Sequence, residues 1–266
     1  MQEIFKPFRK NTANCVFENL LIFFFLYIKK TDMLKNIFYP TSQTIFIWLS
    51  TIYLFFLLYL GKISPLTVLF VYFLETIIIG IFNALKMFCT IKLGNSSGYG
   101  TIVFFLFHYG FFVAIQSIFA FAIFSIGDTI VFKEPFHLID NYSIILNLAD
   151  ILYALPAIIF THVGKFFTDF IGHQKYLKFD IQEIMFSPYV RIFIQQFVVI
   201  LSSFFIIISE SGIFAAILLI LLRFFIDLVM EAIKEKSEML DFVSEKLSNE
   251  KASKETIKKQ LINFTE

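Results

Sequence analysis

Residues 70–88 read FVYFLETIIIGIFNALKMF, an apolar run long enough to cross a membrane as an α-helix. The run nevertheless carries Glu75 near its middle, Asn83 two turns later and Lys86 at its end. At about 100° per residue, Glu75 and Lys86 lie about 20° apart around the helix, and Asn83 lies about 80° from Glu75. Because ionisable residues in a span usually face partners or a wet cavity, we expect these three side chains to point into a helix bundle.

The composition indicates an integral membrane protein. Of the 266 residues, 58% are hydrophobic, 19% are aromatic and only 16% are charged. A water-soluble fold of this composition would expose more apolar surface than soluble proteins carry. The formal net charge of +1 gives no overall field that would favour nucleic acid. The lipid bilayer is therefore the expected partner, and nucleic acid is excluded.

We expect three segments along the chain. Residues 1–42 form a basic N-terminal segment in which the apolar stretch 15–28 is too short to cross about 30 Å of hydrocarbon, so it predicts an interfacial helix. Residues 43–230 form the transmembrane domain. Residues 231–266 are dense in Lys and Glu and predict a cytoplasmic helical tail.

The transmembrane domain is expected to be all-α, a polytopic helix bundle of about six spans. The apolar runs lack the alternation of barrel strands, and helices satisfy their own backbone hydrogen bonds in lipid. A turn at residues 61–65 and a polar stretch at 162–188 separate some of the runs. The expected spans are residues 45–60, 66–88, 101–125, 143–161, 189–209 and 213–230.

The distribution of Lys and Arg predicts that both termini lie in the cytoplasm and that the chain sits in the cell membrane as a multi-pass protein. With the N-terminus inside, only Lys62 and Lys133 fall in outer loops. The inner segments hold Lys6, Arg9, Lys10, Lys29, Lys30, Lys35, Lys92, Lys165, Lys175 and Lys178, followed by the lysines after residue 231.

Four segments also carry a family resemblance. They are YFLETIIIGIFNALKM, FFLFHYGFF, SPYVRIFIQQFVVILSSF and LLRFFIDL, in this order and spacing. Together they resemble a family of bacterial multi-pass membrane proteins known as a domain of unknown function, over about residues 45–230. The residues that match its motifs are Glu75, Asn83, Lys86, His108, Tyr109, Gly110, Pro188, Tyr189, Arg191 and Asp227.

The resemblance implies a fold and a site, but no reaction, because the family's activity is unknown. Two departures weaken any case for histidine-based chemistry. Gln116 stands where the family pattern has one histidine, and Gln195 or Gln196 stands where it has another.

Polar residues in other spans are expected to meet Glu75. Arg223 and Asp227 are one turn apart, which permits an internal ion pair, and Arg191 and Gln195 share a helix face in the same way. Three cations and three anions in the spans predict a charge-balanced internal network. They are Lys86, Arg191 and Arg223, and Glu75, Asp150 and Asp227.

His108 is either a proton carrier, because an unperturbed histidine titrates near pH 6.5, or a neutral structural side chain. The other histidines, His137, His162 and His173, are expected in or beside loops, and no metal-binding motif is present. The sequence therefore predicts neither a metal site nor a cofactor.

The leading hypothesis is the binding or transport of a small polar ligand or a proton at an intramembrane site that opens to the cytoplasm. The candidate ligand-binding residues are Glu75, Asn83, Lys86, His108, Gln116, Arg191, Gln195, Arg223 and Asp227. A membrane-embedded enzyme acting on a lipid-like or quinone-like substrate is the first alternative, with Glu75 or His108 as acid or base. A scaffold whose polar groups only lock helices together is the second. Homo-oligomers remain an open partner class.

Overall fold

The computed structural model describes residues 38–41, 44–126, 132–208, 212–233, 237–248 and 252–265. Most of these residues are helical and none forms a β-strand, as the sequence predicted. The chain forms two compact units, a helix bundle over residues 40–231 and a smaller unit that contains the C-terminal helices. The interfacial helix expected at residues 15–28 lies outside the described residues.

The first two helices of the bundle are joined by a short turn. Helix α3 covers Ile45–Tyr59, and α4 covers Pro65–Lys92. Gly61 adopts a positive φ of 63° in the turn, a conformation that glycine tolerates best. Ser64 then caps α4, because its side chain accepts a hydrogen bond from the Thr67 amide at 3.1 Å while Pro65 occupies the first turn.

The middle of the bundle differs from the expected fourth span at residues 143–161. Helix α5 covers Tyr99–Ile126, and the short α6 covers Leu138–Leu146. Helix α7 begins only at Ile151 and runs through Pro156 to Lys165, and the chain continues as the π-helical segment η1, Phe166–Ile171. The prediction was wrong because hydropathy merged α6 with α7, although the two helices are separated by the turn at residues 147–150.

The predicted polar stretch at residues 162–188 is also largely helical. After the short 3₁₀ segment η2, Lys175–Leu177, helix α8 covers Ile181–Ile208 and contains Pro188 in its interior. Helix α9 covers Gly212–Ala232. The expected fifth span at 189–209 therefore starts eight residues later than the observed helix, because Gln182, Glu183 and Ser187 in the first turns of α8 resemble a loop in hydropathy.

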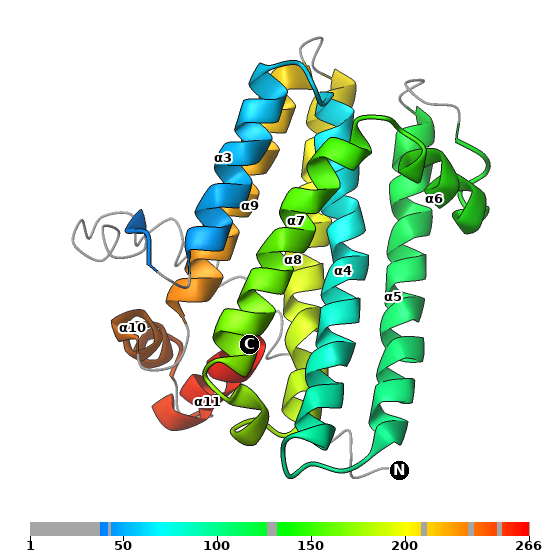
Figure 1. The fold of residues 1–266 in the computed structure, drawn as a ribbon. Helices are drawn as coiled ribbons and strands as arrows, with labels where there is room; N and C mark the ends of the chain where they lie inside the picture. Colours follow the sequence, from blue (N-terminus) through cyan, green and yellow to red (C-terminus); the bar gives the residue numbers. More distant parts are fainter. Residues whose placement is uncertain are drawn as a thin grey trace. The chain divides into compact units, whose positions relative to one another are not determined.

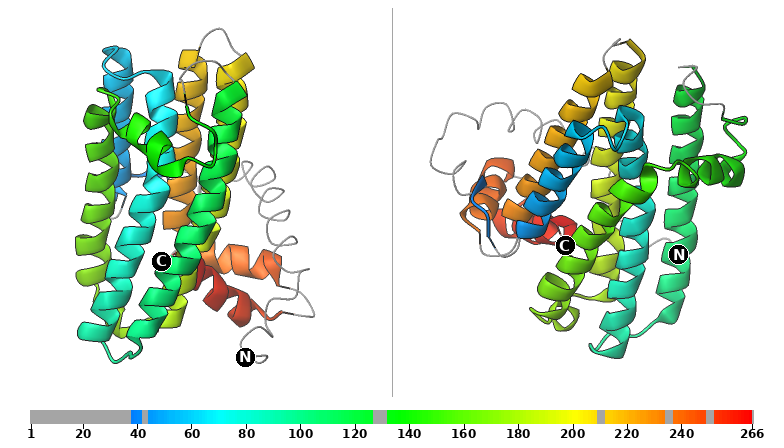
Figure 2. Two further views of the ribbon diagram at one scale, coloured as in Figure 1. Left: turned by 90° about the vertical axis from the view of Figure 1, so that its right-hand side faces the viewer. Right: turned by 45° about the horizontal axis from the view of Figure 1, so that its top comes forward.

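Helix α4 forms the centre of the bundle, packed against α5, α7 and α8 (Figure 1). Its large side chains, including Phe70 and Phe73, are almost fully buried. Helix α5 lies at the edge of the bundle (Figure 2). It leaves much of its apolar surface exposed. Helix α4 is thus covered by protein, whereas α5 faces the surroundings of the bundle.

Four helices in the described part of the chain are long and apolar enough to cross a membrane. At 15 residues, α3 is shorter than a hydrocarbon layer of about 30 Å requires. The four candidate spans are Pro65–Lys92, Tyr99–Ala122, Ile151–Ile171 and Gly212–Ala232.

The smaller unit contains two helices instead of the single helical tail that the sequence predicted. Helix α10 covers Glu238–Leu247 and α11 covers Lys254–Thr265. Leu240 and Leu261 are buried, and Lys254 pairs with Glu245 at 3.1 Å.

Candidate functional site

Glu75 lies near the middle of α4 and is 1% exposed. Arg223 of α9 binds its carboxylate through two hydrogen bonds. Arg223 Nε donates to Glu75 Oε2 at 2.7 Å, and Arg223 Nη2 donates to Oε1. The Arg223 guanidinium also lies over the ring of Tyr72, one turn before Glu75 on α4, at 4.9 Å from the ring centroid. This fork-to-fork geometry fixes the direction of both side chains and not only their separation.

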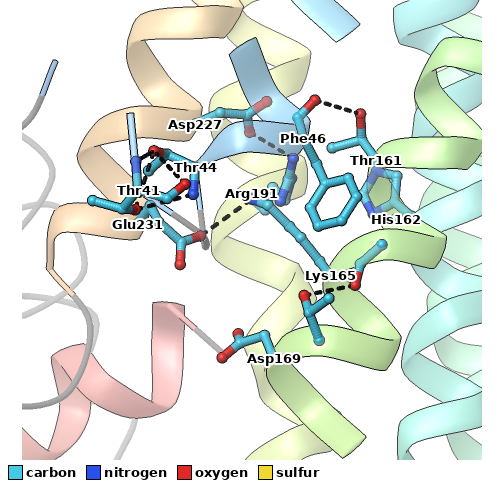
Figure 3. Close-up of polar contacts among 12 residues, drawn as sticks. Thr41, Thr44, Phe46, Thr161, His162, Lys165, Asp169, Arg191, Asp227 and Glu231 are labelled. Atoms are coloured by element: carbon cyan, nitrogen blue, oxygen red, sulfur yellow. Dashed lines mark hydrogen bonds and ion pairs between the residues drawn. The ribbon is translucent and has the colours of Figure 1, made fainter. Parts of the chain in front are cut away.

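Arg191 of α8 joins the two acidic residues. Its Nη2 lies 2.6 Å from Asp227 Oδ1 and 3.5 Å from Glu75 Oε1 (Figure 3 shows the first contact). Asp227 in turn lies 3.4 Å from Arg223 Nη2, one turn away on α9. Each carboxylate therefore faces two guanidinium groups, and the four side chains connect three helices.

His162 is the nearest additional partner of Glu75, and the sequence reading missed it. Its Nε2 lies 2.8 Å from Glu75 Oε1, and its ring stacks on Phe82 at a centroid distance of 5.9 Å. The expected place beside a loop was wrong because α7 continues to Lys165 instead of ending near residue 161. The apolar content of residues 151–171, interrupted by single polar residues, is the signal that could have indicated this longer helix.

A further ion pair extends the group toward the ends of α7 and α9. Lys165 Nζ lies 3.2 Å from Glu231 Oε2, and both side chains are largely buried (Figure 3). Lys165 follows His162 by one turn, and Glu231 follows Asp227 by one turn, so both pairs lie on continuous helix faces. The charged cluster is defined here as Glu75, His162, Lys165, Arg191, Arg223, Asp227 and Glu231.

The charged cluster is balanced, but two of its members differ from the expected network. It contains three cations, three carboxylates and one histidine. Lys165 takes the place predicted for Lys86, and Glu231 takes the place predicted for Asp150. Lys86 lies instead over the ring of Phe170, and Asp150 precedes α7.

Where Arg223 and Asp227 meet, two polar atoms lack a hydrogen-bond partner among the described residues. They are Nη1 of Arg223 and Oδ2 of Asp227, both buried. One is a donor and the other an acceptor, on side chains that already approach each other at 3.4 Å. Buried polar atoms are normally satisfied, so these two are exceptions within the charged cluster.

Two other candidates, both on α4, lie outside the charged cluster. Asn83 is buried and donates through Nδ2 to the Ile184 carbonyl at 3.0 Å, which ties α4 to α8. Lys86 lies over the Phe170 ring at 5.5 Å from its centroid. Asn83 misses the charged cluster because its offset of about 80° from Glu75 turns it toward a different neighbour.

His108 and Gln116 on α5 are also separate from the charged cluster. His108 is exposed, and its Nδ1 lies 2.7 Å from the Tyr189 hydroxyl. Gln116 is buried. The side chain of Gln195 lies outside the described residues. Of the five residues predicted to converge, Glu75, Arg191 and Asp227 meet in the charged cluster, whereas Asn83 and His108 lie outside it.

Asp150 was expected near the middle of a span and instead precedes α7. Its Oδ2 accepts hydrogen bonds from the Ser64 amide at 3.0 Å and from the Thr67 hydroxyl. Partial burial raises the pKa of this carboxyl, but the hydrogen bonds outweigh burial and hold the pKa below its ordinary value. Asp150 thus connects the start of α4 to the start of α7.

Comparison with protein families shows which family the chain belongs to. A model described as "Family of unknown function (DUF6498)" matches residues 33–255. The chain belongs to this family. The match includes every residue of the charged cluster, and the expectation of a family without a known activity is confirmed. No curated protein and no solved structure matches the chain.

Proposed function

We propose that this member of the DUF6498 family is a multi-pass membrane protein whose charged cluster binds a proton or a small polar ligand. The observation that carries the proposal is that two buried atoms, Arg223 Nη1 and Asp227 Oδ2, lack a hydrogen-bond partner among the described residues. A molecule with one acceptor and one donor satisfies both atoms together. A proton delivered through such a molecule protonates Asp227 at Oδ2, and the guanidinium groups stay charged because they have no acceptor for it.

The membrane placement follows from the long apolar helices. Helices α4 and α5 each have 28 residues, which is about 42 Å of helix and exceeds a hydrocarbon layer of about 30 Å. We assign α8 as a further span, since it has the same length. The shorter α3 completes a six-helix domain by packing against α7.

Energetics favour a functional cluster over a structural one. A charged residue in a span costs about 2.5–3.5 kcal/mol on insertion scales, and a buried ion pair often adds no stability over apolar side chains of the same volume. Three ion pairs in one bundle are therefore an inefficient way to hold helices together. Binding chemistry gives these charges a role that packing does not.

We assign access to the cytoplasmic end. The cluster runs from Glu75 toward Glu231 near the end of α9, and the side chains of Arg191 and Lys165 are 22% and 18% exposed, against 2% for Glu75. The positive-inside rule favours the cytoplasm for the end where α4 finishes at Lys92 and α8 begins. A ligand from the cytoplasm meets Lys165 and Arg191 before it meets Glu75.

Flux into proteoliposomes tests the proposal. The purified full chain is reconstituted with an internal pH dye for protons, and vesicle swelling is followed by light scattering for urea and glycerol. We expect flux above that of empty vesicles for at least one probe, and a loss of about tenfold or more in Asp227→Asn, equal to about 1.4 kcal/mol in the barrier.

The matched control is Asp241→Asn, which changes the same chemical group outside the bundle, where Asp241 pairs with Lys258 on α11. It should retain wild-type flux. Flux that equals that of empty vesicles for all three probes would leave the scaffold as the explanation of the cluster.

A further inference from the structure

A second region, on the opposite face of α8 from Arg191, carries polar side chains that the charged cluster does not use. Tyr189 of α8 packs among rings of α5, and its hydroxyl lies 2.7 Å from His108 Nδ1. Its ring centroid lies 6.4, 5.5, 5.9 and 5.8 Å from those of Phe105, His108, Tyr109 and Phe112. These contacts fix the register of the seam between α5 and α8.

With this register, two glutamines, one on α5 and one on α8, lie at the same height along the seam. Helices α5 and α8 run in the same direction (Figures 1 and 2). Gln116 follows Tyr109 by seven residues, and Gln196 follows Tyr189 by seven residues. Seven residues are about two turns, so each glutamine lies about 10 Å further along its helix and about 20° from the face of its tyrosine.

The contact between α5 and α8 continues from Tyr189 toward the two glutamines. Val113 of α5 packs against the buried cluster that contains Ile192 of α8. Gln116 and Gln196 come one turn after these two residues. The polar level therefore lies directly above an apolar one.

Both glutamines have buried polar atoms without partners. Gln116 is 6% exposed, and among the described residues neither its Oε1 nor its Nε2 makes a hydrogen bond. The Oε1 of Gln196 is buried and lacks a partner in the same part of the chain. Because buried amides are normally satisfied, two acceptor oxygens and one amide donor remain for another molecule.

The surroundings select a neutral ligand that comes from the bilayer. Arg191 lies about 160° around α8 from Tyr189, so its charge faces a different interface. On the outer side of α5, Phe107 is 78% exposed and Phe111 is 63% exposed, as expected for a surface in contact with lipid. A ligand can enter such a seam laterally from lipid, with an apolar body that fits the aromatic walls.

We propose that the α5–α8 seam binds a neutral amphiphile with hydroxyl groups, a quinol or an acylglycerol, through Gln116 and Gln196. Hydroxyl groups donate to the two glutamine Oε1 atoms and accept from Gln116 Nε2. The aromatic rings around Tyr189 contact the ring or acyl part of the ligand. This site is independent of the charged cluster and of its proposed function.

Thermal unfolding of the detergent-purified full chain tests the proposal with two matched probe pairs. Decylubiquinol is compared with decylubiquinone under argon, and dioleoylglycerol with trioleoylglycerol, because only the first member of each pair carries a hydroxyl donor. Binding to the folded state raises the melting temperature by mass action, by about 5 °C at saturation. A shift with the quinol alone identifies a quinol, and a shift with dioleoylglycerol alone identifies an acylglycerol.

Variants locate the shift in the seam. Gln116→Leu and Gln196→Leu should fold, because each removes a buried amide without a partner, and each should abolish the shift. Phe107→Leu, on the exposed side of α5, should keep it. Equal shifts within a probe pair, no shift with any probe, or a shift that survives both glutamine substitutions would overturn the proposal.

Discussion

Arg223 holds both carboxylate oxygens of Glu75, so a single residue of the last bundle helix fixes the one acidic side chain of the central helix. This contact makes α4 and α9 dependent on each other. Removing one partner of a buried pair leaves the other charge without compensation, which typically costs about 3–5 kcal/mol. The first prediction follows from this cost of leaving one buried charge without its partner.

Arg223→Leu should lower the stability of the bundle by about 3–5 kcal/mol because Glu75 loses its main partner. Arg223→Lys should lie between this variant and the wild type, since an ammonium cannot donate as a planar fork. The measurement is chemical or thermal unfolding in detergent. The double variant Glu75→Gln/Arg223→Leu should recover stability relative to Arg223→Leu alone, and a simply additive result would contradict the pairing.

Prediction from sequence succeeded for charged residues within apolar runs, because a charge that faces lipid is energetically costly. Glu75, Arg191, Arg223 and Asp227 are charged residues in apolar runs, and the structure brings them into contact. Hydropathy also predicted that these residues lie on α-helices and in which order those helices follow along the chain. The reason is physical: such groups are too costly to leave facing lipid, so their direction is implied by their presence.

Prediction failed where it depended on helix ends and helix rotation. His162 was missed because the end of α7 was placed one residue before it. His108 was assigned to the interior although it is exposed. Helix α5 is apolar on all sides, so its sequence contains no signal that distinguishes a face toward protein from a face toward lipid.

His162→Leu should destabilise the bundle by about 1–3 kcal/mol, because Glu75 Oε1 loses a hydrogen-bond partner in a buried site. His162→Gln should retain part of the stability, since an amide can still donate to the carboxylate. Unfolding in detergent is the measurement. His173→Leu is the matched control, because this histidine contacts Asp169 at 3.3 Å with a half-exposed side chain and should change stability little.

Gly80→Ala should destabilise the contact between α4 and α5 by about 1–3 kcal/mol through overpacking. A Cβ at Gly80 would overlap the Tyr109 ring, with Cδ1 at 2.9 Å, and the Tyr109 hydroxyl is anchored to the Thr76 carbonyl at 2.6 Å. Gly110→Ala on α5 is the control, because nothing lies within 4 Å of its added Cβ. It should be neutral or stabilising by up to about 1 kcal/mol, as alanine favours helix. Equal effects of the two substitutions would contradict this packing.

Labelling from outside the cell tests the proposed orientation. A cysteine at Glu134, in the loop before α6, should react with a membrane-impermeant maleimide on intact cells. A cysteine at Ser96, between α4 and α5, should react only after lysis, because the Lys and Arg distribution places that end in the cytoplasm. Both are introduced after Cys15 and Cys89 are changed to Ser. The reverse labelling pattern would invert the topology and the access route to the charged cluster.

Asp150→Asn should reduce stability at neutral pH and lose this effect in acid. The folded carboxyl has a pKa below its ordinary value, because hydrogen bonds from Thr67 and Ser64 outweigh its partial burial. A carboxyl in the unfolded chain titrates near pH 3.9, above the pKa of Asp150 in the folded state. The unfolded state therefore binds more protons between the two pKa values, so the stabilisation is complete above about pH 5 and disappears as pH falls through the folded pKa.

Melting temperatures between pH 3 and pH 7 should thus show the wild type approaching Asp150→Asn as the pH is lowered. Thr67→Val should weaken the same pH dependence, because it removes the hydroxyl that donates to Asp150 Oδ2. A difference between the wild type and Asp150→Asn that stays constant down to pH 3 would show that the charge of Asp150 does not hold the start of α4 to the start of α7.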